Sequence, residues 1–217
     1  MKDIAIYGGG GFGREVACVV RQINDCILSK EEKWNLIGFF DDVLPRGTEI
    51  EYGITLGGMD ALNSYSSPLN IVFGIGSPKA VSILHSKITN PKITFPNIFD
   101  PSIQWLDQDN VQIGIGNVIC AQSFVSCNVT IGNFNIINNG VSLGHDCVIG
   151  DYNAVMPASR ISGGVKIGNR NFIGVNSVVL QYHSIADDIT VGAGSVVMKN
   201  IRKPGTYVGI PAQKIKF

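Results

Sequence analysis

The sequence predicts two domains, a small Rossmann-like α/β domain over residues 1–97 and a parallel β-helix over residues 98–217. Ile, Leu or Val stands at every sixth position from Ile113 to Val197, fifteen times in succession. Before residue 97 this pattern is absent, and short apolar segments alternate with segments of helical spacing. A period of six fits neither an α-helix nor an alternating strand, and it indicates short strands stacked in a solenoid.

Each hexad is expected to form one strand and one corner, with three hexads in each coil. Residues eighteen positions apart then lie on neighbouring coils. The aliphatic first positions form interior columns and are structural. The fifth positions are mostly small or amide side chains, which predicts stacked corner ladders: Ser123, Ser159, Ser177, Ser195, Asn117, Asn135, Asn153 and Asn171.

The N-terminal region has the pattern of a small parallel α/β unit. An apolar strand over residues 4–7 precedes a glycine-rich loop, and helical spacing follows from Arg14. A second strand over residues 36–40 ends at Asp41-Asp42, and a third over residues 69–73 ends at Gly74-Ile75-Gly76. Strands that alternate with helices in this way predict a parallel sheet.

Composition and charge limit the classes of function. Lys+Arg and Asp+Glu balance at 17 each, so we expect neither nucleic acid nor a membrane as a partner. The first apolar run is too short for a signal peptide, and no segment approaches the ~20 apolar residues of a membrane span. Five scattered cysteines without a CxxC pair indicate reduced thiols, and we expect a cytoplasmic protein.

His145 is the candidate catalytic residue of the β-helix. It occupies the third position of its hexad, off the aliphatic column, and is expected to point outward. Gly163 stands eighteen positions later, so an imidazole would lie beside a bare backbone that can present an N–H. Acyl transfer needs such a base and such a donor for the developing oxyanion, and Asp146 is a possible partner of the imidazole. The alternative is that His145 is a solvated corner residue.

The other histidines and Cys147 carry weaker signals. His183 stands at a fifth position and is a second catalytic candidate, whereas His85 is expected to be a plain surface residue. The spacings of 60 and 38 residues between the three histidines do not suit a zinc site, so no metal is expected. Cys147 beside His145 suggests a nucleophile, but its fifth position favours packing in the interior.

The glycine-rich loop predicts a phosphate site. Gly8, Gly10 and Gly13 have the GxGxxG spacing between a strand and a helix, which cradles phosphate at a helix N-terminus. Asp41-Asp42 ends the next strand, where a carboxylate could hold a ribose or a base. Fewer than 100 residues are too few for a full dinucleotide fold, so a mononucleotide or nucleotide-sugar pocket fits better.

Taken together, the chain resembles the PglD/NeuD-like family of hexapeptide-repeat sugar acetyltransferases. The resemblance spans nearly the full length: the glycine-rich start, Phe39-Phe40-Asp41-Asp42, the hexads and the closing Gly209-Ile210-Pro211-Ala212. Its most specific segment runs from Asn138 to Asp151. The resemblance implies a left-handed β-helix, a trimer, acetyl-CoA bound between neighbouring helices, and a nucleotide sugar on the N-terminal domain.

The resemblance also implies roles for single residues. His145 matches the general base, Asp146 its acidic partner, and Asn138 a position near the sugar. The positions implied for acetyl-CoA are Gly163, Gly164, Gly209, Pro211 and Ala212, and those for the nucleotide are Gly8, Gly10, Gly11, Gly13, Asp41, Asp42 and Gly76. Phe12 departs from members that carry His in this loop, and residues 27–35 lengthen the first crossover.

The expected function is an acetyl-CoA-dependent N-acetyltransferase that acts on a nucleotide-linked amino sugar, a 4-amino-6-deoxyhexose, for bacterial surface glycan synthesis. One alternative is an O-acetyltransferase that acts on sialic acid or a related sugar. A second, from another class, is a non-catalytic β-helix that binds sugar nucleotides. Binding of a nucleotide to the N-terminal domain would argue against the sialic acid O-acetyltransferase. Binding of acetyl-CoA would argue against the non-catalytic β-helix.

Overall fold

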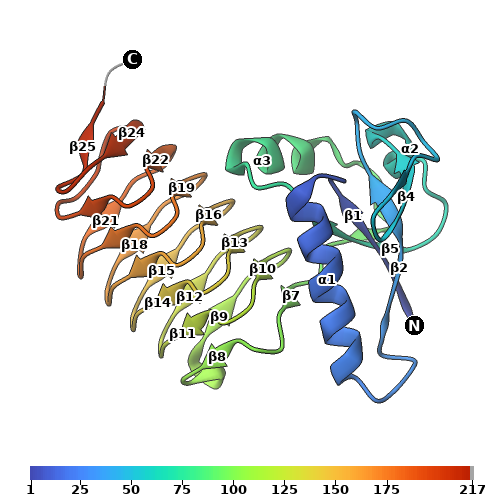
Figure 1. Ribbon diagram of the computed structural model, residues 1–217, viewed down its shortest axis with the longest axis horizontal. Coiled ribbons are helices and arrows are strands. Elements are labelled where there is room, and N and C mark those ends of the chain that lie inside the picture. The colour runs from blue at the N-terminus through green and yellow to red at the C-terminus, as the bar shows by residue number, and fades with distance from the viewer. Residues whose placement is uncertain (216–217) are drawn as a thin grey trace. The chain divides into compact units, whose positions relative to one another are not determined.

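The structure, a computed structural model, describes residues 1–215, which separate into two compact units (Figure 1). The first comprises Met1–Gly76 and Ala80–Pro101, and the second comprises Ser77–Lys79 and the chain from Ser102 onward. The first unit is an α/β unit and the second is a left-handed parallel β-helix, so the predicted fold class is confirmed.

The N-terminal unit is built on one mainly parallel sheet with the strand order β3-β4-β2-β1-β5-β6. β1 pairs in parallel with both β2 and β5, so the carboxyl ends of these three strands meet at one edge, where ligands bind in open α/β sheets. The strands are β1 (Lys2–Tyr7), β2 (Trp34–Phe40), β3 (Glu49–Ile50), β4 (Gly53–Gly57), β5 (Leu69–Phe73) and β6 (Ile93–Thr94), and β7 (Ile98–Phe99) follows. The helices are α1 (Gly11–Cys26), α2 (Met59–Asn63) and α3 (Pro78–Lys87).

Two features of this unit differ from the sequence prediction. Helix α1 begins at Gly11, three residues before Arg14, because the last glycines of the loop already have helical geometry and Gly10 is the N-cap. The hairpin β3–β4 and the short helix α2 were not expected. β3 has two residues, and its turn places Tyr52 at φ +74°, a local arrangement with no hydrophobic periodicity to indicate it.

The β-helix stacks two-residue strands with an offset of eighteen residues. Ile119 pairs with Ile137, Ile131 with Ile149, and Leu143 with Ile161, all in parallel. The strands are β8 (Gln104–Trp105), β9 (Gln112–Ile113), β10 (Val118–Ile119), β11 (Phe124–Val125), β12 (Thr130–Ile131), β13 (Ile136–Ile137), β14 (Ser142–Leu143), β15 (Val148–Ile149), β16 (Ala154–Val155), β17 (Arg160–Ile161), β18 (Lys166–Ile167), β19 (Phe172–Ile173), β20 (Val178–Val179), β21 (Ser184–Ile185), β22 (Ile189–Val191) and β23 (Val196–Val197). A 3₁₀ turn, η1 (Gln108–Asn110), interrupts the first coil.

The interior of the β-helix confirms the expected columns and ladders. Every predicted first-position aliphatic except Ile113 is at most 3% exposed. The Oδ1 of Asn117 accepts the backbone N–H of Asn135 at 2.9 Å, and Asn135 and Asn153 repeat this one coil along. These ladders satisfy backbone groups that would otherwise be buried unpaired at the corners.

The fourth position of the hexad turns the corner in the left-handed backbone region. Fourteen residues there have φ between +55° and +69°, and only four of them are glycines: Gly116, Gln122, Asn128, Phe134, Gly140, Asp146, Tyr152, Ala158, Gly164, Arg170, Asn176, Tyr182, Asp188 and Gly194. This conformation is costly for most L-residues, yet the stacked coils impose it. It directs the fourth-position side chains of successive coils along shared outer columns.

The chain after the last coil adds β24 (Gly205–Val208), parallel to β22, and β25 (Gln213–Lys214), antiparallel to β24.

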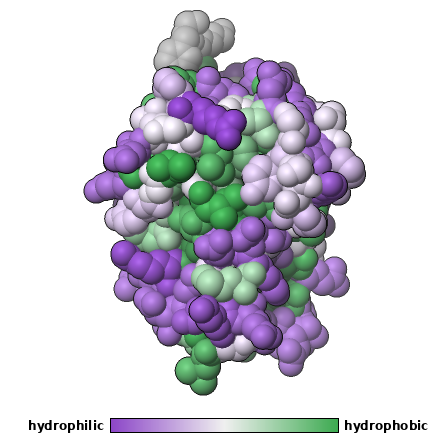
Figure 2. All heavy atoms as spheres, turned by 90° about the vertical axis from the view of Figure 1, so that its right-hand side faces the viewer, coloured by the Kyte–Doolittle hydropathy of each residue, from purple (hydrophilic) through white to green (hydrophobic). Residues whose placement is uncertain are grey.

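Figure 2 shows hydrophobic residues gathered near the centre of one face, among hydrophilic ones. Leu28 and Val43 are the most exposed large hydrophobic residues, at 100% and 87%. Of the helices within residues 1–215, none has both the length and the apolar character needed to span a membrane.

Candidate active site

His145 and Asp146 form a hydrogen-bonded pair at the corner between β14 and β15. The Nδ1 of His145 lies 2.8 Å from Oδ2 of Asp146, and the two side chains are 52% and 57% exposed. Asp146 occupies the left-handed corner position at φ +59°, and its N–H donates to the carbonyl of Cys127 at 3.1 Å. The pairing of an outward imidazole with an acidic neighbour is therefore present.

The carboxylate fixes the tautomer of the imidazole. An ionised carboxylate only accepts hydrogen bonds, so Nδ1 of His145 carries the proton and Nε2 keeps its lone pair. The hydrogen bond from His145, and after it one from Asn128, hold the pKa of Asp146 below its ordinary value. Asp146 is thus ionised at neutral pH, and His145 presents Nε2 as a base.

Gly163 lies under the imidazole, one coil along. A Cβ atom on Gly163 would stand 2.3 Å from Nε2 of His145, so the ring occupies the space that any other residue would fill. The N–H of Gly164 donates to the carbonyl of His145 at 2.8 Å. Among the described residues, the N–H of Gly163 has no hydrogen-bond acceptor. A base and an uncommitted backbone donor are therefore adjacent.

Gly164 is covered in a similar way by Tyr182. A Cβ atom on Gly164 would lie 2.4 Å from the Tyr182 ring, and Gly164 has φ +67°, a backbone conformation that favours glycine. Tyr182 itself is 74% exposed. The two consecutive glycines thus leave room for the His145 and Tyr182 rings close to the backbone of the β-helix.

The remaining candidates in the β-helix have structural contacts. Cys147 is fully buried and donates to the carbonyl of Ser162 at 3.1 Å, and burial raises its thiol pKa to about 11. Such a thiol is a poor nucleophile at neutral pH, so the packing interpretation holds. The Nδ1 of His183 lies 3.4 Å from Asn200 Oδ1, and the carbonyl of His183 accepts the N–H of Lys166 at 3.0 Å, both of them structural contacts.

The expectation for His85 was wrong. His85 is half-buried against Phe95, edge to face at 5.0 Å between ring centroids, and burial lowers the pKa of His85. Helix α3 packs this face inward, which an isolated helical pattern of ten residues does not reveal. Within residues 1–215, no three His, Cys, Asp or Glu side chains come together as a metal site would require.

The other implied acetyl-CoA and sugar positions have defined local roles. Asn138 is 5% exposed, and its Oδ1 accepts the N–H of Asn139 at 2.7 Å. Gly209 donates its N–H to Ser195 Oγ at 3.0 Å, and Ala212 donates to the carbonyl of Val196 at 2.8 Å, which fastens the closing segment with Pro211 to the last coil. Their contacts with ligands stay predictions.

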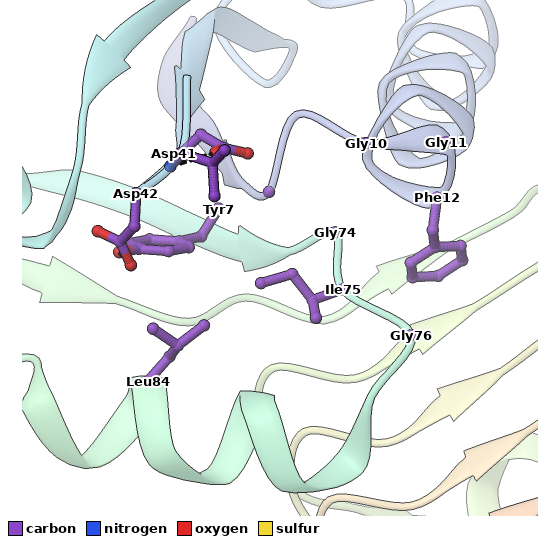
Figure 3. Close-up of a pocket in the computed structure, with 12 residues that line it drawn as sticks. Tyr7, Gly10, Gly11, Phe12, Asp41, Asp42, Gly74, Ile75, Gly76 and Leu84 are labelled. Atoms are coloured by element: carbon purple, nitrogen blue, oxygen red, sulfur yellow. Dashed lines mark hydrogen bonds between the residues drawn. The ribbon is translucent and has the colours of Figure 1, made fainter. Parts of the chain in front are cut away.

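A pocket of about 410 Å³ lies at the carboxyl edge of the sheet in the N-terminal unit (Figure 3). The glycine-rich loop and the ends of β1, β2 and β5 line it, together with one residue of α3. In the view of Figure 3, Asp42 and Tyr7 lie at one side, Phe12 at the other, and Ile75 between them. The lining residues are Tyr7, Gly8, Gly10, Gly11, Phe12, Asp41, Asp42, Val43, Gly74, Ile75, Gly76 and Leu84.

Asp41 organises the two loops of this pocket. Its Oδ2 accepts the N–H of Gly9 at 2.8 Å, and its Oδ1 accepts those of Val43 and Leu44 at 2.9 and 3.1 Å. Burial acts to raise the pKa of Asp41, but these three donors outweigh it and hold the pKa below its ordinary value. Both oxygens of Asp41 are thus engaged with the protein's own backbone.

Asp42 is held differently. Its Oδ2 accepts the hydroxyl of Tyr7 at 2.8 Å, and its Oδ1 accepts the N–H of Met59 at 2.9 Å. Burial, and then the hydrogen bond and charge of Asp42, raise the pKa of Tyr7, so Tyr7 stays a neutral donor. Each Asp42 oxygen keeps a further lone pair for a ligand donor.

The glycines of the loop divide into two groups. Gly8 has φ +110°, and a Cβ atom on Gly13 would stand 1.9 Å from the carbonyl oxygen of Gly8, so these two allow the close turn between β1 and α1. Gly10 and Gly11 have open space at the start of α1 and line the pocket. Gly13 supports the loop without lining the pocket.

Two polar residues of these sites were not identified from the sequence. Tyr7 is the last residue of an apolar strand, so the sequence predicts a core residue there. No pattern in the sequence indicates that its hydroxyl donates to Asp42. Asn128 contacts Asp146, and the eighteen-residue offset that pairs His145 with Gly163 could have found it, because Asn128 stands eighteen positions before Asp146.

Comparison with known proteins identifies related chains. Residues 3–88 match the PglD N-terminal domain family. A perosamine N-acetyltransferase from Caulobacter crescentus, solved with CoA and GDP-perosamine, superposes with a TM-score of 0.87 at 26% identity over 100% of this chain and 98% of that chain. WeeI from Acinetobacter baumannii superposes with a TM-score of 0.83 at 28% identity, over 99% and 100% of the two chains.

Curated relatives match over a shorter range. UDP-3-O-acylglucosamine N-acyltransferase 1 from Sulfurimonas denitrificans is 35% identical over 106 residues, which are 48% of this chain and 32% of that protein. The chain spans no more than about a third of the length of the curated relatives it matches.

Proposed function

We propose that this chain, which is similar to sugar acetyltransferases of the PglD/NeuD-like family, is an acetyl-CoA-dependent N-acetyltransferase acting on a nucleotide-linked amino sugar. The observation that carries the proposal is the His145–Asp146 pair lying against the Gly163 backbone. It combines an oriented base with a backbone donor that is not otherwise engaged, which is what transfer of an acyl group to an amine requires.

The proposed mechanism is direct attack of the acceptor amine on the thioester carbonyl carbon. Nε2 of His145 takes the amine proton as the C–N bond forms, and Asp146 stabilises the resulting imidazolium through Nδ1–H. The N–H of Gly163 stabilises the oxyanion. The C–S bond then breaks, and the proton held by His145 passes to the leaving thiolate of CoA. Cys147 is buried and takes no part, so no acyl-enzyme forms.

The N-terminal pocket supports a nucleotide-linked acceptor. Gly10 and Gly11 leave open space at the N-terminus of a sixteen-residue helix with no acidic residue in its first turn, which favours a diphosphate. Asp42 and the apolar Ile75 and Phe12 provide an acceptor and surfaces for a base. The Caulobacter relative was solved with GDP-perosamine, and by analogy we expect a 4-amino-6-deoxyhexose here. A homotrimer is part of the proposal, to be checked by sedimentation.

The experiment is thiol release from acetyl-CoA against UDP-, dTDP- and GDP-linked 4-amino sugars, the matching 3-amino sugars, and free sialic acid. Release with one nucleotide-linked amino sugar, reduced at least ~100-fold in His145→Ala, is the expected result, because a positioned base contributes on that scale. Release only with sialic acid would instead assign O-acetylation. If acetyl-CoA does not bind at all, the catalytic proposal fails and a non-catalytic role remains.

A further inference from the structure

Asn128 contacts the far side of the Asp146 carboxylate. Its Nδ2 donates to Asp146 Oδ1 at 3.3 Å, while Oδ2 of the same carboxylate takes Nδ1–H of His145 at 2.8 Å. Asn128 and Asp146 occupy the same corner in successive coils, with φ of +55° and +59°. The strands that follow them pair in register, Thr130 with Val148, so the two side chains run along one outer column.

We propose that Asn128 is a positioning residue of the active site, whose carboxamide holds the Asp146 carboxylate in the orientation that keeps Nε2 of His145 directed as the base. The proposal rests on the proposed function. Asp146 is more than half exposed, so a single hydrogen bond to His145 would leave its carboxylate free to rotate. Two anchors, one on each oxygen, define its plane, and outer partners of this kind commonly orient the groups that act directly.

The neighbouring ladder shows that this contact is of a different kind. Asn133 also stands eighteen positions before an aspartate, but there both its backbone N–H and its Nδ2 donate to Asp151, at 2.7 and 3.1 Å. That arrangement stabilises a backbone corner. At Asn128 the carboxamide alone reaches Asp146, whose own N–H is already bonded to the Cys127 carbonyl. Removal of the Asn128 side chain therefore leaves the backbone hydrogen bonds of the corner intact.

A competing role comes from a cavity of about 240 Å³ that Asn128 also lines, with Asp109, Asn110, Gln112 and Thr130. All of these side chains are polar, so Asn128 could instead contact the acceptor directly. The two roles predict different kinetics. A positioning residue changes kcat and the titration of Asp146, whereas a substrate contact changes KM for the acceptor and leaves the titration of Asp146 unchanged.

The test uses Asn128→Gly, since glycine accepts φ near +55° without strain and removes the whole carboxamide. The matched control is Asn176→Gly, an exposed corner residue at φ +56° whose side chain makes no hydrogen bond within residues 1–215. We expect kcat of Asn128→Gly to fall about 10-fold or more, the lower end of the roughly 10–100-fold scale on which outer partners act. KM for acetyl-CoA and for the acceptor should stay within about twofold, and the control should match the parent protein.

A second readout does not depend on turnover. Titration of the Asp146 carboxyl carbon by NMR should show its pKa rising in Asn128→Gly, because a hydrogen bond to the ionised form is lost. Asn128→Asp has nearly the same shape and also tolerates the corner, yet it replaces the donor with a negative charge. It should raise that pKa further and lower kcat more than Asn128→Gly does.

An unchanged Asp146 titration in both variants would overturn the proposal, and a raised acceptor KM in that case would assign Asn128 to the substrate. An unchanged kcat alongside a shifted titration would also overturn the catalytic part. If the parent protein transfers no acetyl group to any acceptor, the proposed function fails and the positioning role fails with it. The titration would then still decide whether Asn128 holds Asp146.

Discussion

The imidazole of His145 lies over the Cα of Gly163, one coil along the β-helix, so closely that a methyl group on Gly163 would stand 2.3 Å from Nε2. Gly163 has no positive φ, so its backbone does not demand glycine. The residue is small because the histidine ring needs its space. A substitution of Gly163 should therefore displace the His145 imidazole without disturbing the backbone of the β-helix.

Gly163→Ala is therefore expected to fold normally and to lose activity. The added methyl group meets the end of an exposed side chain, which can turn away at little cost in stability, but the turned imidazole no longer presents Nε2 beside the Gly163 N–H. We expect kcat to fall at least ~10-fold, since a misplacement of about 1 Å has large kinetic effects. Thermal unfolding should shift by only a few degrees, about what 1 kcal/mol produces.

A double-mutant cycle provides the control for Gly163→Ala. In the His145→Ala background the ring is absent, so the added methyl group should cost almost nothing further in kcat. If Gly163→Ala reduces kcat equally with and without the imidazole, the glycine acts independently of His145, and this explanation of their contact is wrong.

Asp146→Asn tests the tautomer of His145. The Asp146 carboxylate can only accept a hydrogen bond, so it requires the proton of His145 on Nδ1. The amide of an asparagine can also donate to Nδ1. The proton then moves to Nε2, where the base needs its lone pair. We expect kcat to fall on the order of 10-fold or more, with KM for acetyl-CoA little changed. Nitrogen NMR of the imidazole should show Nδ1-protonated histidine in the parent protein and a mixture in the variant. A single Nδ1-protonated form in both would contradict the proposed role.

The β-helix could be predicted from the sequence almost in full because its rule is local and repeated. Ile119, Ile137 and Val155 are buried for the same reason on every coil, so the period alone fixes the strands and the eighteen-residue offset. The contact of His145 with Gly163 follows from that offset. The N-terminal unit has no such repeat. The hairpin around Tyr52 and the burial of His85 depend on tertiary packing, which the local sequence pattern does not predict.

The candidate sites could be predicted in their positions but less well in their hydrogen bonds. Asp41 and Asp42 are adjacent, and both were expected to face a ligand. In the structure Asp41 uses both oxygens on backbone donors, whereas Asp42 pairs with Tyr7 and Met59. Which carboxylate is engaged internally depends on where the loops place their N–H groups, and the spacing of residues does not contain that information.

Cys147 is predicted to be inert in the folded protein. It is fully buried, and its pKa is raised to about 11, so almost no thiolate is present or accessible at pH 7.5. Mapping by mass spectrometry after brief treatment with a thiol reagent should show Cys26, which is exposed, modified before Cys147. Cys147→Ala should keep kcat within a few-fold while losing some stability. Rapid modification of Cys147, with parallel loss of activity, would revive its role as a nucleophile.

Asp41 is predicted to stabilise the glycine-rich loop in a pH-dependent way. Its pKa is lower in the folded protein than in the unfolded chain, so its stabilising effect is fully present above the unfolded value near 3.8 and is lost as the pH falls through the lower folded value. Asp41→Asn should weaken the hydrogen bonds to Gly9, Val43 and Leu44 by about 1–2 kcal/mol at pH 7, the scale of bonds to a charged acceptor after allowance for partial exposure.

Hydrogen exchange at those three amides is the measurement. At pH 7 their protection factors should fall roughly 5–30-fold in Asp41→Asn, the equivalent of that free energy, and the difference from the parent protein should narrow below pH 4 as Asp41 itself becomes protonated. Asp25→Asn on α1 is the matched control, since the Asp25 side chain makes no hydrogen bond within residues 1–215. Equal protection in Asp41→Asn and the control at pH 7 would show that the loop holds its conformation without the carboxylate. Asp41 would then be free to bind the nucleotide, as the sequence first suggested.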